Sequence, residues 1–173
     1  MKKTIYDSPL GKMTILADDR YLYGLWFNDQ KYYGGHYNLD KIESGLTSQA
    51  SKTIDWLNQF FAGQNPSYNK LKLKEQATEF QLRVYNALQK IPYGHTVTYK
   101  ELSDVIQEGH AVKKNLSRAV GNAIGHNQIL LIVPCHRVIG SNGSLTGYAG
   151  GLERKKALLR LERKSSNESN KSY

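Results

Sequence analysis

Cysteine is almost absent from this sequence of 173 residues, which contains only Cys135. A single cysteine excludes an internal disulfide and a cysteine-rich zinc site. Thiols stay reduced in the cytoplasm, so we expect a cytoplasmic protein. We also expect neither a metal ion nor a cofactor.

Long hydrophobic runs are missing as well. No stretch of about 18 consecutive apolar residues occurs, so we expect no membrane span and no membrane partner. Residues 1–13 contain lysines but no apolar core after them, so we expect no secretory signal. Hydrophobic residues nevertheless make up 39% of the chain, which is typical of a folded protein.

Acidic residues are few: 15 Asp and Glu stand against 24 Lys and Arg, for a formal net charge of +9. Residues 1–78 carry 10 basic and 8 acidic side chains, whereas residues 79–173 carry 14 and 7. This uneven excess indicates a polyanionic partner for the second part, most readily a nucleic acid. A basic surface without a partner is the alternative.

The first part of the chain has the pattern of a small sheet with one helix. Residues 13–17 and 21–27 are rich in β-forming residues and flank an Asp-Asp-Arg turn. Apolar residues recur at helical spacing between residues 51 and 63. A polar connection follows, and we place the domain boundary at residues 75–78.

The second part has the pattern of several helices. Thr78 and Thr98 each precede a Gln or Glu by three residues, which is the signature of a capping box at a helix start. The helix after Thr98 and the helix over residues 115–125 are consistent with a helix-turn-helix. Any other helical hairpin would give the same pattern.

The chain then becomes apolar and afterwards polar. Residues 129–133 are all apolar and predict a buried strand, and a glycine-rich loop follows at residues 140–151. A final helix is predicted up to Glu162. The predicted organisation is α+β in three parts: a strand-rich domain, a helical domain and a polar tail without regular structure, at residues 1–77, 78–162 and 163–173.

Cys135 has unusual neighbours, because Pro134 precedes it and His136 and Arg137 follow it. A lone cysteine is usually a small hydrophobic core residue. A basic or cationic neighbour, however, increases the fraction of reactive thiolate. Adjacent side chains on an extended chain point in opposite directions, so Cys135 and His136 meet only across a sharp turn or through a water molecule.

Glu162 is a candidate partner for the histidine. It follows Leu158 by four residues and Leu159 by three, so it shares their inward face. We expect the helix to end here, where its macrodipole disfavours an anion by roughly 0.3–1 kcal/mol. A carboxylate in that place gains from a hydrogen-bond donor, and a histidine that becomes cationic gains from a carboxylate. A solvent-exposed glutamate beside Arg163 is the alternative.

The helix over residues 115–125 presents mostly small residues, including Ser117, Gly121 and Asn122. A protein that reads the major groove would present longer hydrogen-bonding side chains. Small residues allow the close backbone approach that suits the minor groove, and Arg118 is long enough to enter the base stack.

Three segments of the chain resemble the O6-alkylguanine-DNA alkyltransferases, also called methylated-DNA–protein-cysteine methyltransferases. They are residues 78–102, 117–125 and 133–162, and the last includes the specific signature "PCHRV". Residues 1–77 resemble that family only in length and in their strand-rich start. The resemblance implies an RNase H-like first domain and a winged-helix-like second domain. It also implies a monomer that binds double-stranded DNA through the minor groove.

The resemblance further implies a reaction. A damaged guanine is flipped out of DNA, and its O6-alkyl group passes irreversibly to Cys135, once per molecule. O4-alkylthymine is a second candidate substrate. By the same comparison His136 acts as a base through a water molecule, and Glu162 orients it. Asn127 braces the turn of the cysteine, and Tyr99 donates a hydrogen bond towards the flipped base.

The remaining implied site residues contact the substrate or the DNA. Those at the guanine are Tyr148, the backbone of Ala149, and Val133. Those at the DNA are Arg118, which fills the space of the flipped base, and Tyr99, Lys100, Ser141, Gly121 and Asn122.

Two other functions fit parts of the sequence. A cysteine–histidine hydrolase needs its histidine on a separate element, whereas here it is the next residue. A catalytically silent helix-turn-helix DNA-binding module would not need the thiol, and alkyltransferase-like proteins of this kind usually carry tryptophan in its place. Cys135 therefore favours the enzyme.

Overall fold

The structure is a computed structural model that describes the backbone of residues 1–171 and the side chains of residues 1–167. It divides into two compact units. Unit 1 comprises Met1–Gln76 and Gln128–Leu130, and unit 2 comprises Ala77–Asn127 and the chain from Leu131 onward. The α+β prediction is confirmed. None of the described helices is both long enough and apolar enough to cross a membrane.

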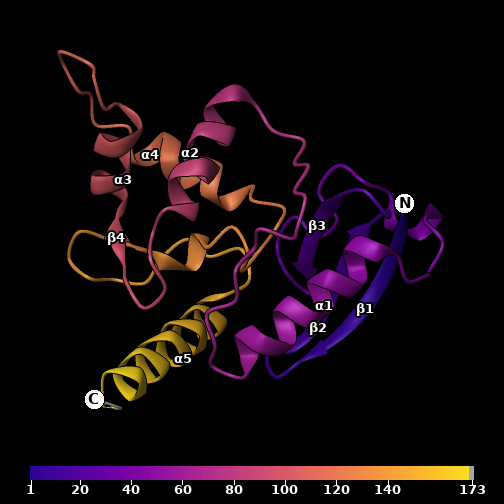
Figure 1. The fold of residues 1–173 in the computed structure, drawn as a ribbon. Coiled ribbons are helices and arrows are strands. Elements are labelled where there is room, and N and C mark those ends of the chain that lie inside the picture. The colour runs from indigo at the N-terminus through magenta and orange to yellow at the C-terminus, as the bar shows by residue number, and fades with distance from the viewer. Residues whose placement is uncertain (172–173) are drawn as a thin grey trace. The chain divides into compact units, whose positions relative to one another are not determined.

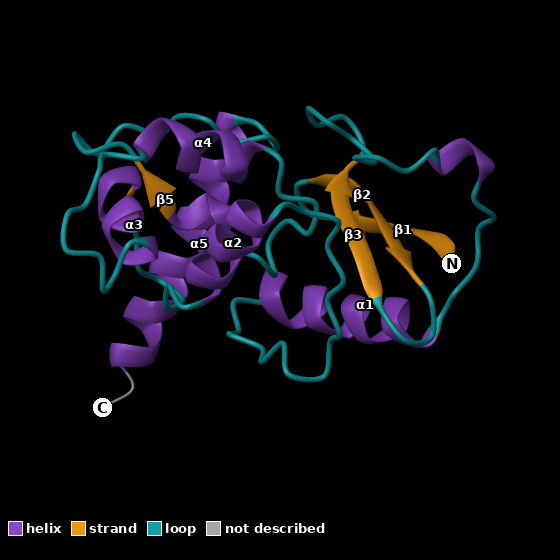
Figure 2. Ribbon diagram, turned by 90° about the horizontal axis from the view of Figure 1, so that it is seen from above, coloured by secondary structure: helices purple, strands orange, loops and turns teal. Residues whose placement is uncertain are grey.

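Unit 1 is an antiparallel sheet with a helix on one face (Figure 2). Its elements are β1, β2, β3, the 3-10 turn η1 and α1, at Lys2–Ser8, Gly11–Ala17, Leu22–Phe27, Leu39–Lys41 and Ser48–Phe61. The strands lie in chain order in the sheet, and α1 packs against all three. The sequence prediction missed β1, because this edge strand is partly exposed and lacks a clean apolar alternation.

Both faces of the sheet are buried, because successive side chains of a strand point to opposite sides. Leu16 and Trp26 cluster with Leu39 of η1 on one face. Met13 and Ile15 point to the other face, which α1 covers, and both are fully buried. Unit 1 therefore has a core of its own.

A short segment of the later chain completes this sheet at Leu25. The Leu25 amide donates to the Gln128 carbonyl at 2.8 Å, and the Leu130 amide donates to the Leu25 carbonyl at 3.0 Å. The strand predicted over residues 129–133 is wrong: Ile129 makes an isolated bridge to Leu25, and the chain then turns. The apolar run reflects burial, which periodicity alone cannot distinguish from strand pairing.

The described part of unit 2 has four helices and one short parallel strand pair (Figure 1). Its elements are α2, β4, α3, α4, the 3-10 turn η2, β5 and α5, at Glu79–Gln89, Val97–Thr98, Tyr99–Ile106, Ser117–Gly125, Cys135–Arg137, Val138–Ile139 and Leu152–Lys171. α2, α3 and α4 pack against one another. The predicted capping box of Thr78 and Gln81 is confirmed at the start of α2.

The strand pair joins two parts of the site. Val97 of β4 pairs with Val138 of β5, and Thr98 pairs with Ile139. Because the strands are parallel, Tyr99 and Gly140 leave them at the same end. The start of α3 therefore lies beside the glycine-rich loop.

α5 is longer than predicted, because it continues past Glu162 to Lys171. The tail predicted over residues 163–173 is therefore helical as far as the backbone is described, and residues 172–173 lie outside the described residues. Ser166 of this extension lies close to the turn at Gly94. Glu162 lies inside the helix, so the expected position at its C-terminus is wrong.

Candidate active site

Cys135 begins the 3-10 turn η2, whereas the sequence predicted a loop after a strand. The Cys135 amide donates to the Val133 carbonyl at 2.8 Å, and the Arg137 amide donates to the Pro134 carbonyl at 3.1 Å. The chain therefore turns sharply at the cysteine, which is one of the two conditions under which Cys135 and His136 can act together. Cys135 is 1% exposed and His136 is 0% exposed.

Asn127 holds the cysteine turn from the end of α4. Its Nδ2 donates to the Val133 carbonyl at 2.9 Å and to the Cys135 Sγ at 3.4 Å. A hydrogen bond to sulfur favours the thiolate over the thiol. Asn127 is buried, so this contact is shielded from water.

His136 and Glu162 form a buried pair. The Nε2 of His136 and the Oε2 of Glu162 are hydrogen-bonded. Burial lowers the pKa of His136, although the Glu162 carboxylate opposes this effect, so the imidazole is neutral at pH 7. Nε2 then carries the hydrogen that it donates to Glu162, and Nδ1 is the basic nitrogen.

Glu162 also receives hydrogen bonds on its other oxygen. Its Oε1 accepts from Arg137 Nε at 2.8 Å and from the Gly94 amide at 3.0 Å. Burial would raise the pKa of Glu162, but hydrogen bonds and charges from His136 and Arg137 outweigh it and lower the pKa to about 2. The carboxylate is therefore ionised and can stabilise an imidazolium when His136 takes up a proton.

Lys155 is a buried cation that the sequence analysis missed. It is 1% exposed, and its Nζ donates to the Thr146 carbonyl at 2.9 Å. Burial lowers the pKa of Lys155, and the negative charge of a Cys135 thiolate opposes that shift. A cation that interacts with Cys135 in this way favours the reactive thiolate.

The residues predicted to contact the guanine differ in the hydrogen-bonding groups that they have available. The Tyr148 hydroxyl is buried without a hydrogen-bond partner among the described residues. Burial, together with the charge of Cys135, raises the pKa of Tyr148 well above 10, so it remains a donor. Ala149 is half-buried. The Val133 carbonyl already accepts two hydrogen bonds within the cysteine turn, which occupy both of its lone pairs.

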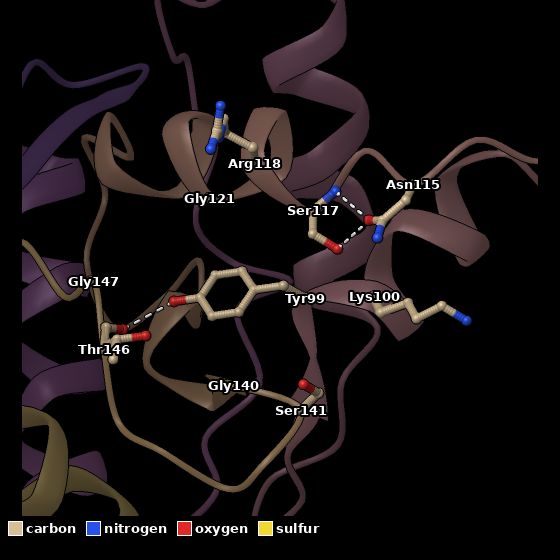
Figure 3. Close-up of a pocket in the computed structure, with 10 residues that line it drawn as sticks. All are labelled: Tyr99, Lys100, Asn115, Ser117, Arg118, Gly121, Gly140, Ser141, Thr146 and Gly147. Atoms are coloured by element: carbon tan, nitrogen blue, oxygen red, sulfur yellow. Dashed lines mark hydrogen bonds between the residues drawn. The ribbon is translucent and has the colours of Figure 1, made fainter.

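A groove of about 630 Å³ lies on unit 2 (Figure 3). Its lining residues are Tyr99, Lys100, Asn115, Ser117, Arg118, Gly121, Gly140, Ser141, Thr146 and Gly147. Five of the six predicted DNA contacts are in this set; Asn122 is exposed on α4 and is not among them. The described lining residues include two cations and no acid, which suits a polyanion.

Tyr99 crosses this groove from the start of α3 to the glycine-rich loop (Figure 3). Its hydroxyl donates to the Thr146 carbonyl at 2.9 Å. Gly147 lies so close that a Cβ there would be 3.1 Å from the Tyr99 hydroxyl. Burial raises the pKa of Tyr99, so this side chain also remains a donor at neutral pH.

Both units match described protein families. Residues 1–74 match the "6-O-methylguanine DNA methyltransferase, ribonuclease-like domain". Residues 79–164 match the "6-O-methylguanine DNA methyltransferase, DNA binding domain".

Curated relatives align over nearly the whole chain. A methylated-DNA–protein-cysteine methyltransferase of Mycolicibacterium paratuberculosis is 42% identical over 163 residues, which cover 92% of this chain and 91% of that protein. A protein of the same name from Methanosarcina acetivorans is 41% identical, over 94% of this chain and 98% of its own.

Solved structures show the same fold. The O6-methylguanine methyltransferase of Mycobacterium tuberculosis is similar with a TM-score of 0.81 and 40% identity, over 95% of this chain and 93% of that chain. The structure of Mycobacterium tuberculosis OGT in complex with DNA has a TM-score of 0.80 and 39% identity, over 95% and 94% of the two chains.

Proposed function

The chain belongs to the 6-O-methylguanine DNA methyltransferase family, and we propose that Cys135 is the residue that receives the alkyl group. The protein is a methylated-DNA–protein-cysteine methyltransferase, which repairs DNA by moving the alkyl group of O6-alkylguanine to its own cysteine. One observation carries the assignment of residues: the buried thiol shares a turn with a neutral histidine that an ionised carboxylate holds.

The proposed reaction begins with proton transfer from the Cys135 thiol to Nδ1 of His136, directly or through a water molecule. Sγ attacks the alkyl carbon, so an S–C bond forms while the C–O6 bond breaks. The electron pair of the broken bond stays on the guanine, which takes up one proton and becomes normal guanine. Glu162 stabilises the imidazolium that exists between these two proton transfers.

Four other residues support this reaction in the proposal. Asn127 and Lys155 favour the thiolate by a hydrogen bond and by positive charge. Tyr148 offers a hydroxyl donor to the flipped guanine, which also meets the backbone of Ala149. Tyr99 donates to the guanine after its hydroxyl turns away from the Thr146 carbonyl. Leaving a buried hydroxyl without a partner costs about 1–3 kcal/mol, so a base that accepts from Tyr148 recovers that cost.

We further propose that double-stranded DNA lies along the groove, with α4 in its minor groove. Lys100 and Arg118 supply positive charge on this face. The protein's own packing does not require glycine at position 121, because a Cβ there would lie at an ordinary 3.8 Å from the Tyr99 ring. The missing side chain therefore suits the close approach of a DNA backbone.

One chain supplies the proposed nucleophile, its base and the carboxylate. This supports the proposal that the protein acts as a monomer. Its single cysteine must stay reduced to react, which supports a cytoplasmic location.

Transfer should stop at one alkyl group per protein molecule. The thioether formed on Cys135 has no ionisable proton and is a poor leaving group, and the sequence contains no second cysteine to accept the group. Incubation with an excess of duplex DNA that carries isotope-labelled O6-methylguanine tests the proposed function. We expect the label on Cys135 to reach a plateau at one equivalent. Continued turnover would contradict the mechanism, and DNA binding without transfer would instead support a silent binding module.

Arg118→Ala should impair repair of duplex DNA far more than reaction with the free base O6-benzylguanine. Arg118 is exposed on α4 at the groove, and extruding a base costs a few kcal/mol that this side chain offsets by filling the stack. We expect the single-turnover rate on duplex DNA to fall about 10- to 100-fold, and the rate on the free base to change less than about twofold.

Lys100→Ala is the matched control for Arg118→Ala, because it removes the same charge from the same groove. It should weaken DNA binding and leave the rate at saturating DNA unchanged. Equal losses on duplex and free base in Arg118→Ala would show that Arg118 serves folding instead of base flipping.

A further inference from the structure

The part of α5 beyond Glu162 contacts the turn between α2 and β4. Ser166 follows Glu162 by four residues, so the two side chains share one face of the helix. Gly94 lies against this face: a Cβ at Gly94 would be 2.2 Å from Ser166 Oγ and 3.6 Å from the Glu162 carbonyl oxygen. Gly94 also has a φ of 81°, so a side chain is disfavoured there on both grounds.

The same turn binds the carboxylate of Glu162. The Gly94 amide donates to Glu162 Oε1 at 3.0 Å, and Arg137 donates both to this oxygen and to the Ile91 carbonyl, each at 2.8 Å. The Arg137 guanidinium lies 5.6 Å from the centre of the Tyr93 ring. Burial raises the pKa of Tyr93, and the nearby side chain of Ser165 opposes that shift. The 91–94 turn is therefore bonded to the Glu162 carboxylate through Gly94, and it lies against Ser166 of the helix extension.

The extension also affects the electrostatic environment of Glu162. The unsatisfied carbonyls at the end of a helix carry partial negative charge, and this effect falls off within the last turn. Because α5 runs on to Lys171 (Figure 1), that charge lies far from the Glu162 carboxylate. A helix that ended just after Glu162 would place it beside the anion.

We propose that residues 165–167 of α5 are positioning residues for catalysis. They pack against the 91–94 turn, which keeps its bond to Glu162 in place, and they keep the C-terminal end of the helix away from the Glu162 carboxylate. This inference rests on the proposed role of Glu162 as the partner of His136. Attraction to DNA phosphates does not explain a role for these residues, because Ser165, Ser166 and Asn167 carry no charge. They act through Glu162 and do not touch the reacting atoms.

Two truncations test this proposal. Ending the chain after Lys164 removes Ser165–Asn167, whereas ending it after Asn167 keeps them and is the matched control. We expect the first to slow single-turnover transfer about threefold to tenfold, on duplex DNA and on free O6-benzylguanine alike, because the defect lies at the Glu162–His136 pair and not at the DNA groove. The control should react at the wild-type rate, and both proteins should bind undamaged DNA normally.

A double-mutant cycle separates positioning from a general loss of structure. In a Glu162→Gln background the truncation after Lys164 should change the rate less than about twofold, because the group it positions is already gone. A loss as large as in the wild-type background, or a loss on duplex DNA alone, would overturn the proposal.

The double substitution of Ser165 and Ser166 by alanine tests the same contact without shortening the helix, in case the truncated chain does not fold. Its rate should also fall on both substrates, and an unchanged rate would overturn the part of the proposal that concerns the turn. The full-length protein is measured in the same assay. If it transfers no alkyl group, the proposed function fails, and that result is distinct from a failure of this inference.

Discussion

We expect Cys135→Ala to abolish alkyl transfer and to leave DNA affinity within about twofold of the wild-type value. The chemistry needs the sulfur, because no other cysteine in the sequence can take the alkyl group. In the proposed complex DNA lies along the groove, and Cys135 is not among the described lining residues. Asn127 keeps its bond to the Val133 carbonyl and loses only the longer bond to Sγ, so we expect the turn to stay folded. Transfer of label and binding of an O6-methylguanine duplex are measured on one sample.

Cys135→Ser is the control for size, because it keeps a side chain of similar volume whose hydroxyl is a far weaker nucleophile at neutral pH. It should bind DNA and transfer nothing. If Cys135→Ala instead unfolds or no longer binds DNA, Cys135 is a core residue, and the assignment of the nucleophile is wrong.

We expect Glu162→Gln to slow transfer about 100-fold or more, which is within the range of general-base effects. Glutamine keeps the size of the side chain but removes the charge that stabilises the imidazolium of His136. It also leaves the buried guanidinium of Arg137 without its counter-ion, so we expect the free energy of unfolding at pH 7 to fall by about 3 kcal/mol. Single-turnover rates and denaturant unfolding measure the two effects separately.

The acid stability of the wild-type protein should also differ from that of Glu162→Gln. The pKa of Glu162 falls from an ordinary 4.5 to about 2 on folding, so its contribution is present above pH 4.5 and is lost as the pH falls towards 2. The pKa of His136 is also lowered, so stability begins to decline below about pH 6.5, where the unfolded chain takes up a proton. The free energy of unfolding is measured at pH 7, 5 and 3. Between pH 5 and pH 3 the wild type should lose the contribution of Glu162, and Glu162→Gln should not show this loss. The same pH dependence in both would contradict this account.

Local sequence signals predicted part of this molecule well. The capping box at Thr78, the helices around it and the α+β class follow from short-range patterns that the structure keeps. The run at residues 129–133 misled the prediction, because a buried turn and a buried strand look alike in hydrophobicity. The extension of α5 lies against the turn at Gly94, which is distant in sequence, whereas its polar composition alone indicated a tail.

The active-site prediction was incomplete for a similar reason. Lys155 lies seven residues before Glu162 and three before Leu158, so it shares the face on which Glu162 was placed, and this spacing could have identified it. Arg137 was read as a cation that acts on the thiol, whereas in the structure it binds Glu162 and the Ile91 carbonyl. Hydrogen bonds between residues so far apart in the chain are not visible in a single sequence.

The return of Gln128–Leu130 to the sheet has a consequence for synthesis on the ribosome. Until these residues emerge, the amide and carbonyl of Leu25 in β3 lack the partners they have in the finished protein. Such an open strand edge is a template for pairing with other chains. We expect this edge of the nascent N-terminal part to stay open until a contact of high sequence separation forms, which prolongs its exposure to other chains. A proteolytic or engineered fragment of Met1–Gln76 would carry the same exposed edge permanently.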